Sequence, residues 1–123
     1  MEKVKCRREA IPLKERMLGL TDVMELFGGK WKFRILFNLN EHGEMRFKDL
    51  QETTVGISPK VLSKELQDLE ENMMITRTVN STKPVTVTYA ITDYAMNAEP
   101  VISALIDFGL IHRETIKGKL RQD

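Results

Sequence analysis

The sequence predicts a single α+β domain that is mainly helical and carries a two- to three-stranded antiparallel sheet. Three observations support this prediction. A chain of 123 residues corresponds to one domain and can bury an ordinary apolar core. Apolar residues recur at helical spacing in several segments up to residue 73. Two later segments, 75–79 and 85–91, are rich in Val, Ile, Thr and Tyr, which is typical of paired strands.

The first two helices are predicted from capping and spacing. Thr21 is expected to cap a short helix that ends at Gly28-Gly29, because Asp22 places negative charge in the first turn. A second helix is expected to begin at Trp31 and to end near residue 40. Its apolar positions recur at helical spacing: Trp31, Ile35, Leu36 and Leu39.

A turn and a longer helix come next. A brief helix is expected over about residues 47–53, followed by a turn at residues 55–57. Ser58 and Pro59 then mark a helix start, since serine caps free amides and proline suits the first helical position. We expect this helix, residues 58–73, to bury one stripe and to expose a polar face. The stripe consists of Leu62, Leu66, Leu69 and Met73.

The two strand segments are separated by a polar loop, residues 80–84, and predict a β-hairpin. Thr92 and Asp93 are expected to cap a last helical region, in which Pro100 resets the start. A short helix, a tight turn, a longer helix and then a two-stranded ribbon are the ingredients of a winged helix-turn-helix. The sequence therefore predicts that fold, with a two- to three-stranded antiparallel wing sheet.

Charge is balanced overall but unevenly distributed. Nineteen basic and eighteen acidic residues give a net charge of +1, so bulk charge does not indicate a polyanionic partner. The helix 58–73 differs in sign at its two ends, with Lys60 and Lys64 in its first half. Its second half carries Asp68, Glu70 and Glu71. The polarity favours an orientation in which the first half approaches an anion.

Several separated motifs resemble one family. They are Gly28-Gly29-Lys30-Trp31, Arg46-Phe47, Ile57-Ser58 with Val61-Leu62, Leu66 and Leu69, then Arg77, Pro84, the run 87–92 and Pro100-Val101-Ile102. In this order they resemble the HxlR-type transcription regulators, a bacterial and archaeal branch close to the MarR superfamily. The match runs roughly from Leu20 to Gly109. The resemblance implies a homodimeric regulator that binds palindromic operator DNA and represses or activates nearby genes.

The DNA-contacting residues are expected on the helix 58–73 and on the hairpin tip. A major groove admits one α-helix, whose N-terminal residues reach the base edges, and Gln67 suits adenine through its donor and acceptor pair. The candidates on the helix are Ser58, Pro59, Lys60, Ser63, Lys64 and Gln67; those on the hairpin are Arg77, Asn80, Ser81, Thr82 and Lys83. Lys30, Lys32 and Arg46 are expected to hold the DNA backbone. The alternative is an ordinary solvated face with a flexible loop.

A second copy of the chain is the other expected partner. One winged helix reads about half a turn of DNA, so two half-sites about 34 Å apart require a dimer. The expected dimerisation residues are Val23, Met24, Phe27, Val101, Ile102, Leu105, Phe108 and His112. The alternative for this apolar stripe is burial within the monomer.

Residues 1–19 are predicted to form a basic N-terminal arm, and residues 20–123 the winged helix-turn-helix domain with dimerisation helices at both ends. The arm holds Cys6, the single cysteine, beside cations that favour its thiolate. The resemblance implies that some family members sense oxidants or electrophiles through a cysteine near the position of Leu18. Cys6 lies upstream of that position. A redox or electrophile switch at Cys6 and an inert tail thiol both stay open.

Other function classes find little support. Gly28-Gly29-Lys30 lacks the frame of a phosphate-binding loop, and two histidines with one cysteine make no metal cluster. We expect no enzyme activity, cofactor, metal or membrane contact, a cytoplasmic location and an effector of unspecified identity. A protein-interaction module without DNA binding is the competing hypothesis, favoured by the near-neutral charge and the acids of the helix 58–73.

Overall fold

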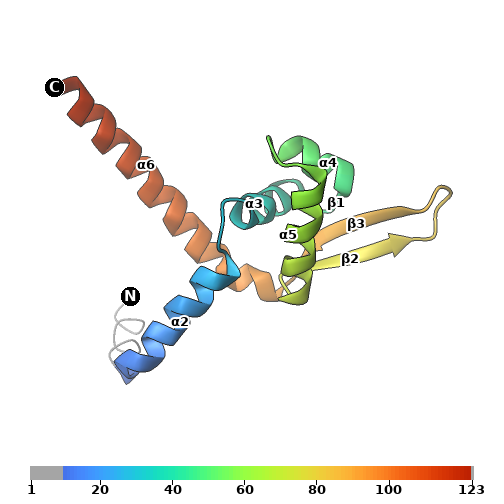
Figure 1. Ribbon diagram of the computed structural model, residues 1–123, viewed down its shortest axis with the longest axis horizontal. Coiled ribbons are helices and arrows are strands. Elements are labelled where there is room, and N and C mark those ends of the chain that lie inside the picture. Colours follow the sequence, from blue (N-terminus) through green and yellow to red (C-terminus); the bar gives the residue numbers. More distant parts are fainter. Residues whose placement is uncertain (1–9, 123) are drawn as a thin grey trace.

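The computed structural model describes residues 10–122. The element order is α2 (Leu13–Leu26), α3 (Lys32–His42), β1 (Met45–Arg46), α4 (Phe47–Thr53), α5 (Pro59–Glu71), β2 (Ile75–Asn80), β3 (Thr86–Ile91), a 3₁₀ helix η1 (Tyr94–Ala98) and α6 (Glu99–Gln122). Helices α3, α4 and α5 cluster around the base of the sheet, and the β2–β3 hairpin extends from them as a wing (Figure 1). The expected α+β winged-helix class is confirmed.

The sheet has three antiparallel strands in the order β1-β3-β2. Strands β2 and β3 pair along their whole length, from Ile75 opposite Ile91 to Asn80 opposite Thr86. The two-residue strand β1 adds to the other edge of β3, where Met45 lies opposite Tyr89. The hairpin was predicted from its sequence, whereas β1 is too short to show an alternating pattern.

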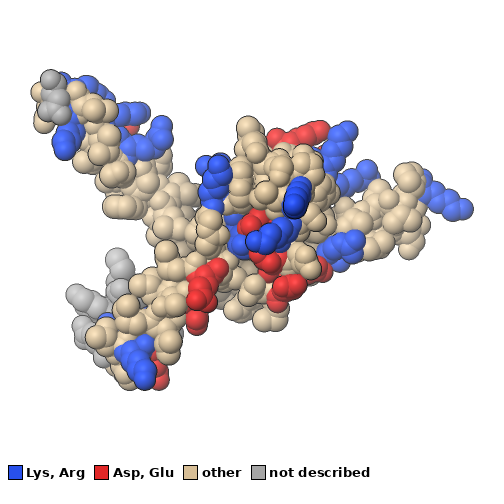
Figure 2. All heavy atoms as spheres, in the orientation of Figure 1, with Lys and Arg blue, Asp and Glu red and all other residues tan. Residues whose placement is uncertain are grey.

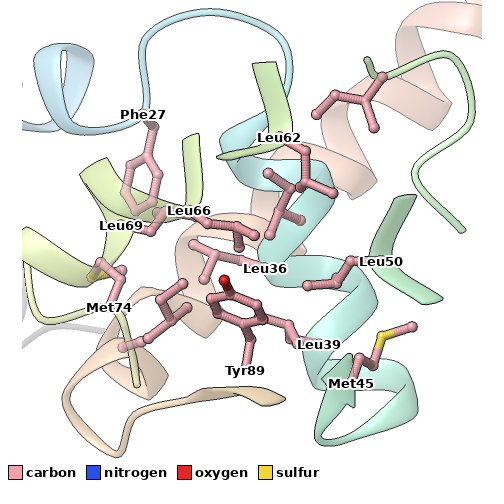
Figure 3. Packing of buried hydrophobic residues seen from close by; sticks show 14 residues of the cluster. Phe27, Leu36, Leu39, Met45, Leu50, Leu62, Leu66, Leu69, Met74 and Tyr89 are labelled. Atoms are coloured by element: carbon pink, nitrogen blue, oxygen red, sulfur yellow. The ribbon is translucent and has the colours of Figure 1, made fainter. Parts of the chain in front are cut away.

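The core lies where α3, α4 and α5 meet the sheet (Figure 3). Its fully buried side chains are Ile35, Leu36 and Leu39 of α3, Leu50 of α4, Leu62, Leu66 and Leu69 of α5 and Ile75 of β2. The predicted leucine stripe of α5 is therefore confirmed at three positions. The prediction that Met73 belongs to this stripe is wrong, because α5 ends at Glu71 and Met73 lies beyond it at φ 63° with an exposed side chain. Met74 enters the core instead.

The N-terminal helix begins earlier than expected. Thr21 is not its N-cap: its hydroxyl donates to the Met17 carbonyl at 2.9 Å, in the middle of α2. The helix starts at Leu13 after Pro12, so the expected boundary between residues 19 and 20 falls inside it. Cys6 and the rest of residues 1–9 lie outside the described residues.

Helices α2 and α6 diverge from the winged-helix core on the side opposite the wing (Figure 1). Neither helix has a buried residue within the described chain. Thr92 connects the core to α6: its hydroxyl donates to the Met73 carbonyl at 2.7 Å and accepts from the Ala95 amide at 3.0 Å.

Over residues 10–122 no helix is both long and apolar enough to cross a bilayer.

Candidate nucleic-acid interface

The N-terminus of α5 is capped as the sequence predicts. The Ser58 hydroxyl accepts a hydrogen bond from the Val61 amide at 3.2 Å, and Pro59 is the first helical residue. Both residues are exposed. Pro59 has no N–H and the Val61 and Leu62 amides are bonded to Ser58, so the Lys60 amide is the donor that the first turn of α5 leaves, at the positive end of the helix dipole, for an anion such as a phosphate.

The polar face of α5 is open. Lys60, Ser63, Lys64 and Gln67 are all exposed, on the side opposite the buried leucines. Successive positions three or four residues apart lie on one side of a helix, so the structure brings these four predicted residues together. Glu70 and Glu71 are exposed at the other end of the same helix. In Figure 2 blue and red side chains are intermixed over the helices around α5, whereas the coloured side chains beside and at the end of the wing are blue.

The wing carries its predicted basic residues at two places. Arg77 is exposed on β2, and Lys83 is exposed in the loop between β2 and β3. The Asn80 amide donates to the hydroxyls of Thr86 and Thr88 at 3.2 and 3.4 Å, which leaves it half-buried. Asn80 therefore braces the hairpin, whereas the predicted residues Arg77, Ser81, Thr82 and Lys83 are exposed on the wing.

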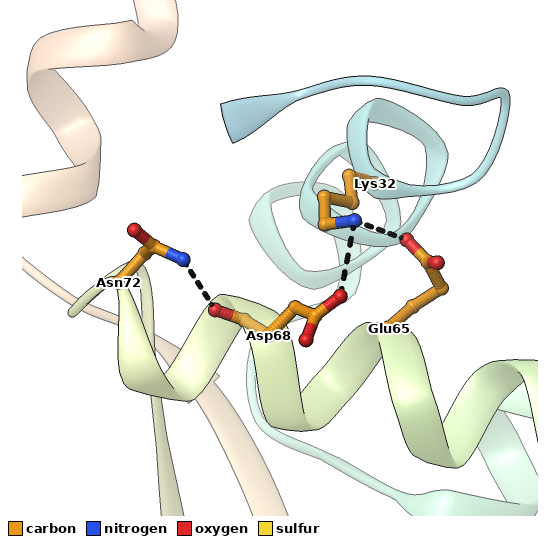
Figure 4. Close-up of polar contacts among 4 residues, drawn as sticks. All are labelled: Lys32, Glu65, Asp68 and Asn72. Carbon is orange, nitrogen blue, oxygen red and sulfur yellow. Dashed lines mark hydrogen bonds and ion pairs between the residues drawn. The ribbon is translucent and has the colours of Figure 1, made fainter. Parts of the chain in front are cut away.

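Of the three cations predicted to hold the DNA backbone, two are exposed and one is buried. Lys30 and Arg46 are exposed, and the Lys30 ammonium lies 4.7 Å from the centroid of the Trp31 ring. Lys32 is a wrong prediction: only 8% of it is exposed. Its Nζ lies 2.7 Å from Glu65 Oε2 and 3.5 Å from Asp68 Oδ2, both on α5 (Figure 4).

The sequence contained a signal for the burial of Lys32. It precedes Ile35 by three residues and Leu36 by four, so it continues the buried stripe of α3. Glu65, which the sequence analysis passed over, lies on α5 within reach of it. The sequence places a lysine on the apolar side of α3 and a glutamate on α5. These two residues predict an ion pair only when the two helices are known to pack together.

The apolar surface of α2 and α6 holds most of the expected dimerisation residues. Val23, Met24, Val101, Leu105, Phe108 and His112 are exposed. Phe27 is wrong as an interface residue, because it is 6% exposed and its ring stacks on that of Phe33 inside the monomer core. Ile102 is half-buried and packs against the same core. The structure adds Leu13, Met17, Leu18, Leu20, Leu110, Ile111, Ile116 and Leu120 to the exposed apolar side chains of these helices.

An open apolar groove of about 610 Å³ continues this surface between α3 and α6. Phe33 and Phe37 line it from α3, Leu105 and Ile106 from α6. The exposed face of α6 is thus continuous with a hollow beside the winged-helix core.

Comparisons with known proteins agree with the fold. The family described as HxlR-like helix-turn-helix matches residues 26–117. The HTH-type transcriptional regulator YtcD of Bacillus subtilis (strain 168) is 30% identical over 105 residues, which cover 85% of this chain and 82% of the relative. A crystal structure of YtcD superposes with a TM-score of 0.71 at 31% identity, covering 85% of this chain and 99% of that one. The reduced form of the regulator YodB from B. subtilis gives 0.67 at 30% identity, covering 73% and 87%.

Proposed function

Because the chain belongs to the HxlR-like helix-turn-helix family of transcriptional regulators, we propose that it regulates transcription by binding palindromic operator DNA as a homodimer. The main observation in support of this proposal is the exposed polar face of α5, which follows a capped helix N-terminus. This face consists of Lys60, Ser63, Lys64 and Gln67.

The chemistry of this face suits duplex DNA. Helix α5 enters the major groove with its N-terminal half, so that Lys60 and Lys64 meet phosphates or guanine edges and Gln67 reads adenine. The Lys60 amide in the first turn donates a hydrogen bond to a phosphate oxygen. Lys83 at the wing tip contacts the flanking backbone or the minor groove. Lys30 and Arg46 add salt-sensitive affinity that carries no sequence information.

The homodimer is supported by the apolar side chains of α2 and α6. Exposed apolar patches larger than a few hundred Å² are rare on monomeric proteins, and these two helices expose large apolar residues along their length. A twofold mate covers them and supplies the second recognition helix, since operators with two half-sites mirror the symmetry of the protein.

Fluorescence anisotropy tests DNA binding directly. A labelled random-sequence duplex of about 30 base pairs, long enough for two half-sites one turn apart, is titrated at about 50 mM and about 200 mM salt. We expect binding that weakens steeply with salt, because each phosphate contact releases counterions. If the protein does not bind the duplex, or if its affinity does not change with salt concentration, the result favours the protein-interaction module instead.

Thiol sensing through Cys6 is the second candidate function. The support is that YodB, one of the structural neighbours, has been solved in a reduced form and after diamide treatment. Cys6 is the single cysteine, so its oxidation can form a disulfide only with another molecule. If Cys6 is the sensor, diamide changes the DNA affinity of the wild type but not of Cys6→Ser. Equal affinity before and after treatment removes this candidate.

A further inference from the structure

Lys32 lies between the helix that begins the winged-helix core and the recognition helix α5. Its ammonium group bridges Glu65 at 2.7 Å and Asp68 at 3.5 Å. The side chains of Lys32 and Glu65 are only 10% and 13% exposed, while that of Asp68 is 35% exposed at the edge of the pair. Buried Glu65 Oε2 receives no other polar contact from the described residues. The three groups therefore form one partly buried unit.

This unit changes the charge of the recognition helix. Helix α5 carries the cations Lys60 and Lys64 but the acids Glu65, Asp68, Glu70 and Glu71, an excess of negative charge on an element that faces a polyanion. Glu65 and Asp68 are the two acids nearest the basic half of the helix. Without a counterion they would repel the phosphates that Lys60 and Lys64 attract.

Stability alone does not account for this arrangement. A buried ion pair seldom stabilises a fold more than well-packed apolar residues of the same volume, because both charges lose their hydration. The same helices already share a buried apolar cluster, to which α3 contributes Leu36 and α5 contributes Leu62 and Leu66. A lysine and a glutamate at this boundary therefore call for a role outside the core.

We propose that Lys32 is a positioning residue for DNA binding: it offsets one of the two negative charges of Glu65 and Asp68 and holds both carboxylates on the α3 side of α5, away from the phosphates. It acts through α5 and does not touch DNA. This proposal rests on the proposed DNA-binding function and explains how an acidic helix can serve as its recognition element.

The test compares wild type, Lys32→Met and the triple variant Lys32→Met/Glu65→Gln/Asp68→Asn. Each is titrated with the labelled random duplex at about 50 mM and about 300 mM salt, after circular dichroism confirms the fold. We expect Lys32→Met to bind about five- to tenfold more weakly at low salt, and within about twofold of wild type at high salt, because the repulsion is screened. The triple variant is expected to bind at least as tightly as wild type, since its three positions carry no charge, whereas in wild type one lysine and two carboxylates leave an excess of negative charge there.

Lys117→Met is the matched control, because Lys117 pairs with Glu114 at 3.6 Å on the exposed surface of α6. It is expected to bind as wild type does. If Lys32→Met does not fold, the double variant Glu65→Gln/Asp68→Asn is measured in its place. Tighter DNA binding than wild type supports the proposal, and unchanged or weaker binding overturns it.

The outcomes separate the two proposals. A folded triple variant that binds as weakly as Lys32→Met shows a packing role and overturns the positioning role. Wild-type affinity in Lys32→Met, with weakened binding in Lys64→Ala, overturns the positioning role and leaves DNA binding intact. A wild-type protein that fails to bind the duplex at either salt concentration overturns both.

Discussion

The ring of Phe27 stacks on the ring of Phe33, with centroids 4.3 Å apart and planes inclined by 18°. Phe27 follows the last residue of α2 and Phe33 lies in the first turn of α3, so this contact fixes the projecting helix to the winged-helix core. The chain between the two rings contains Gly28-Gly29, where Gly29 adopts φ 87° and lets the direction change sharply. This aromatic pair thus ties the end of α2 to the core, against which Leu26 of α2 also packs.

Replacing Phe27 by Ala is expected to lower the free energy of unfolding by about 3–5 kcal/mol, because the buried ring leaves a cavity in the core. Urea denaturation followed by circular dichroism measures this change. The control is Val85→Ala in the exposed wing loop, which is expected to shift stability by less than about 0.5 kcal/mol. Equal stability of both variants would show that Phe27 is not a core residue.

Ser58 combines a structural role with the proposed functional one, and two variants separate them. Ser58→Ala removes the acceptor for the Val61 amide and is expected to cost about 1 kcal/mol of stability. Ser58→Asp keeps a capping oxygen and retains stability, but its negative charge faces the phosphates and lowers DNA affinity. Thermal melts and anisotropy titrations of both variants test this prediction, which fails if Ser58→Asp binds the duplex as tightly as wild type.

The features of α5 were predictable because their signals are local. Ser58 and Pro59 specify the start of the helix, and the leucines at 62, 66 and 69 specify its buried side, all within one stretch of sequence. Thr21 shows the limit of such signals. Threonine suits a cap but also fits inside an exposed helix, where its hydroxyl bonds to a preceding carbonyl, as it does here to Met17.

The remaining features depend on contacts between distant segments. Strand β1 exists because Met45 and Arg46 meet Tyr89 and Thr88, more than forty residues away in sequence. The burial of Lys32 likewise requires Glu65 of another helix. A lysine near a helix start is usually exposed, so charge alone favoured a DNA contact, and only the packing of α3 on α5 reverses that interpretation.

Lys64→Ala is expected to weaken binding to duplex DNA by about tenfold and to leave the melting temperature unchanged. Lys64 is exposed on the open face of α5, so its loss removes a phosphate or base contact without disturbing the core. If the contact is to a phosphate, the slope of log affinity against log salt also falls by about one. Anisotropy titrations across salt concentrations measure both quantities. Lys117→Ala on the exposed end of α6 is the control, and equal affinity of wild type and Lys64→Ala would exclude Lys64 from the interface.

Phe108→Asp is expected to convert the proposed homodimer into a monomer. Phe108 is 67% exposed on α6 within the chain. A carboxylate buried in an apolar interface lacks both hydration and a partner. Light scattering coupled to gel filtration measures the mass, and circular dichroism checks that the helices are retained.

The matched control is Val85→Asp, which places the same charge on an equally exposed apolar residue of the wing loop and is expected to remain dimeric. Monomeric Phe108→Asp should also lose most of its affinity for duplex DNA, because one recognition helix then acts without its twofold mate. A dimeric Phe108→Asp, or a wild-type chain that is already monomeric at micromolar concentration, contradicts the assignment of α6 to the dimer interface.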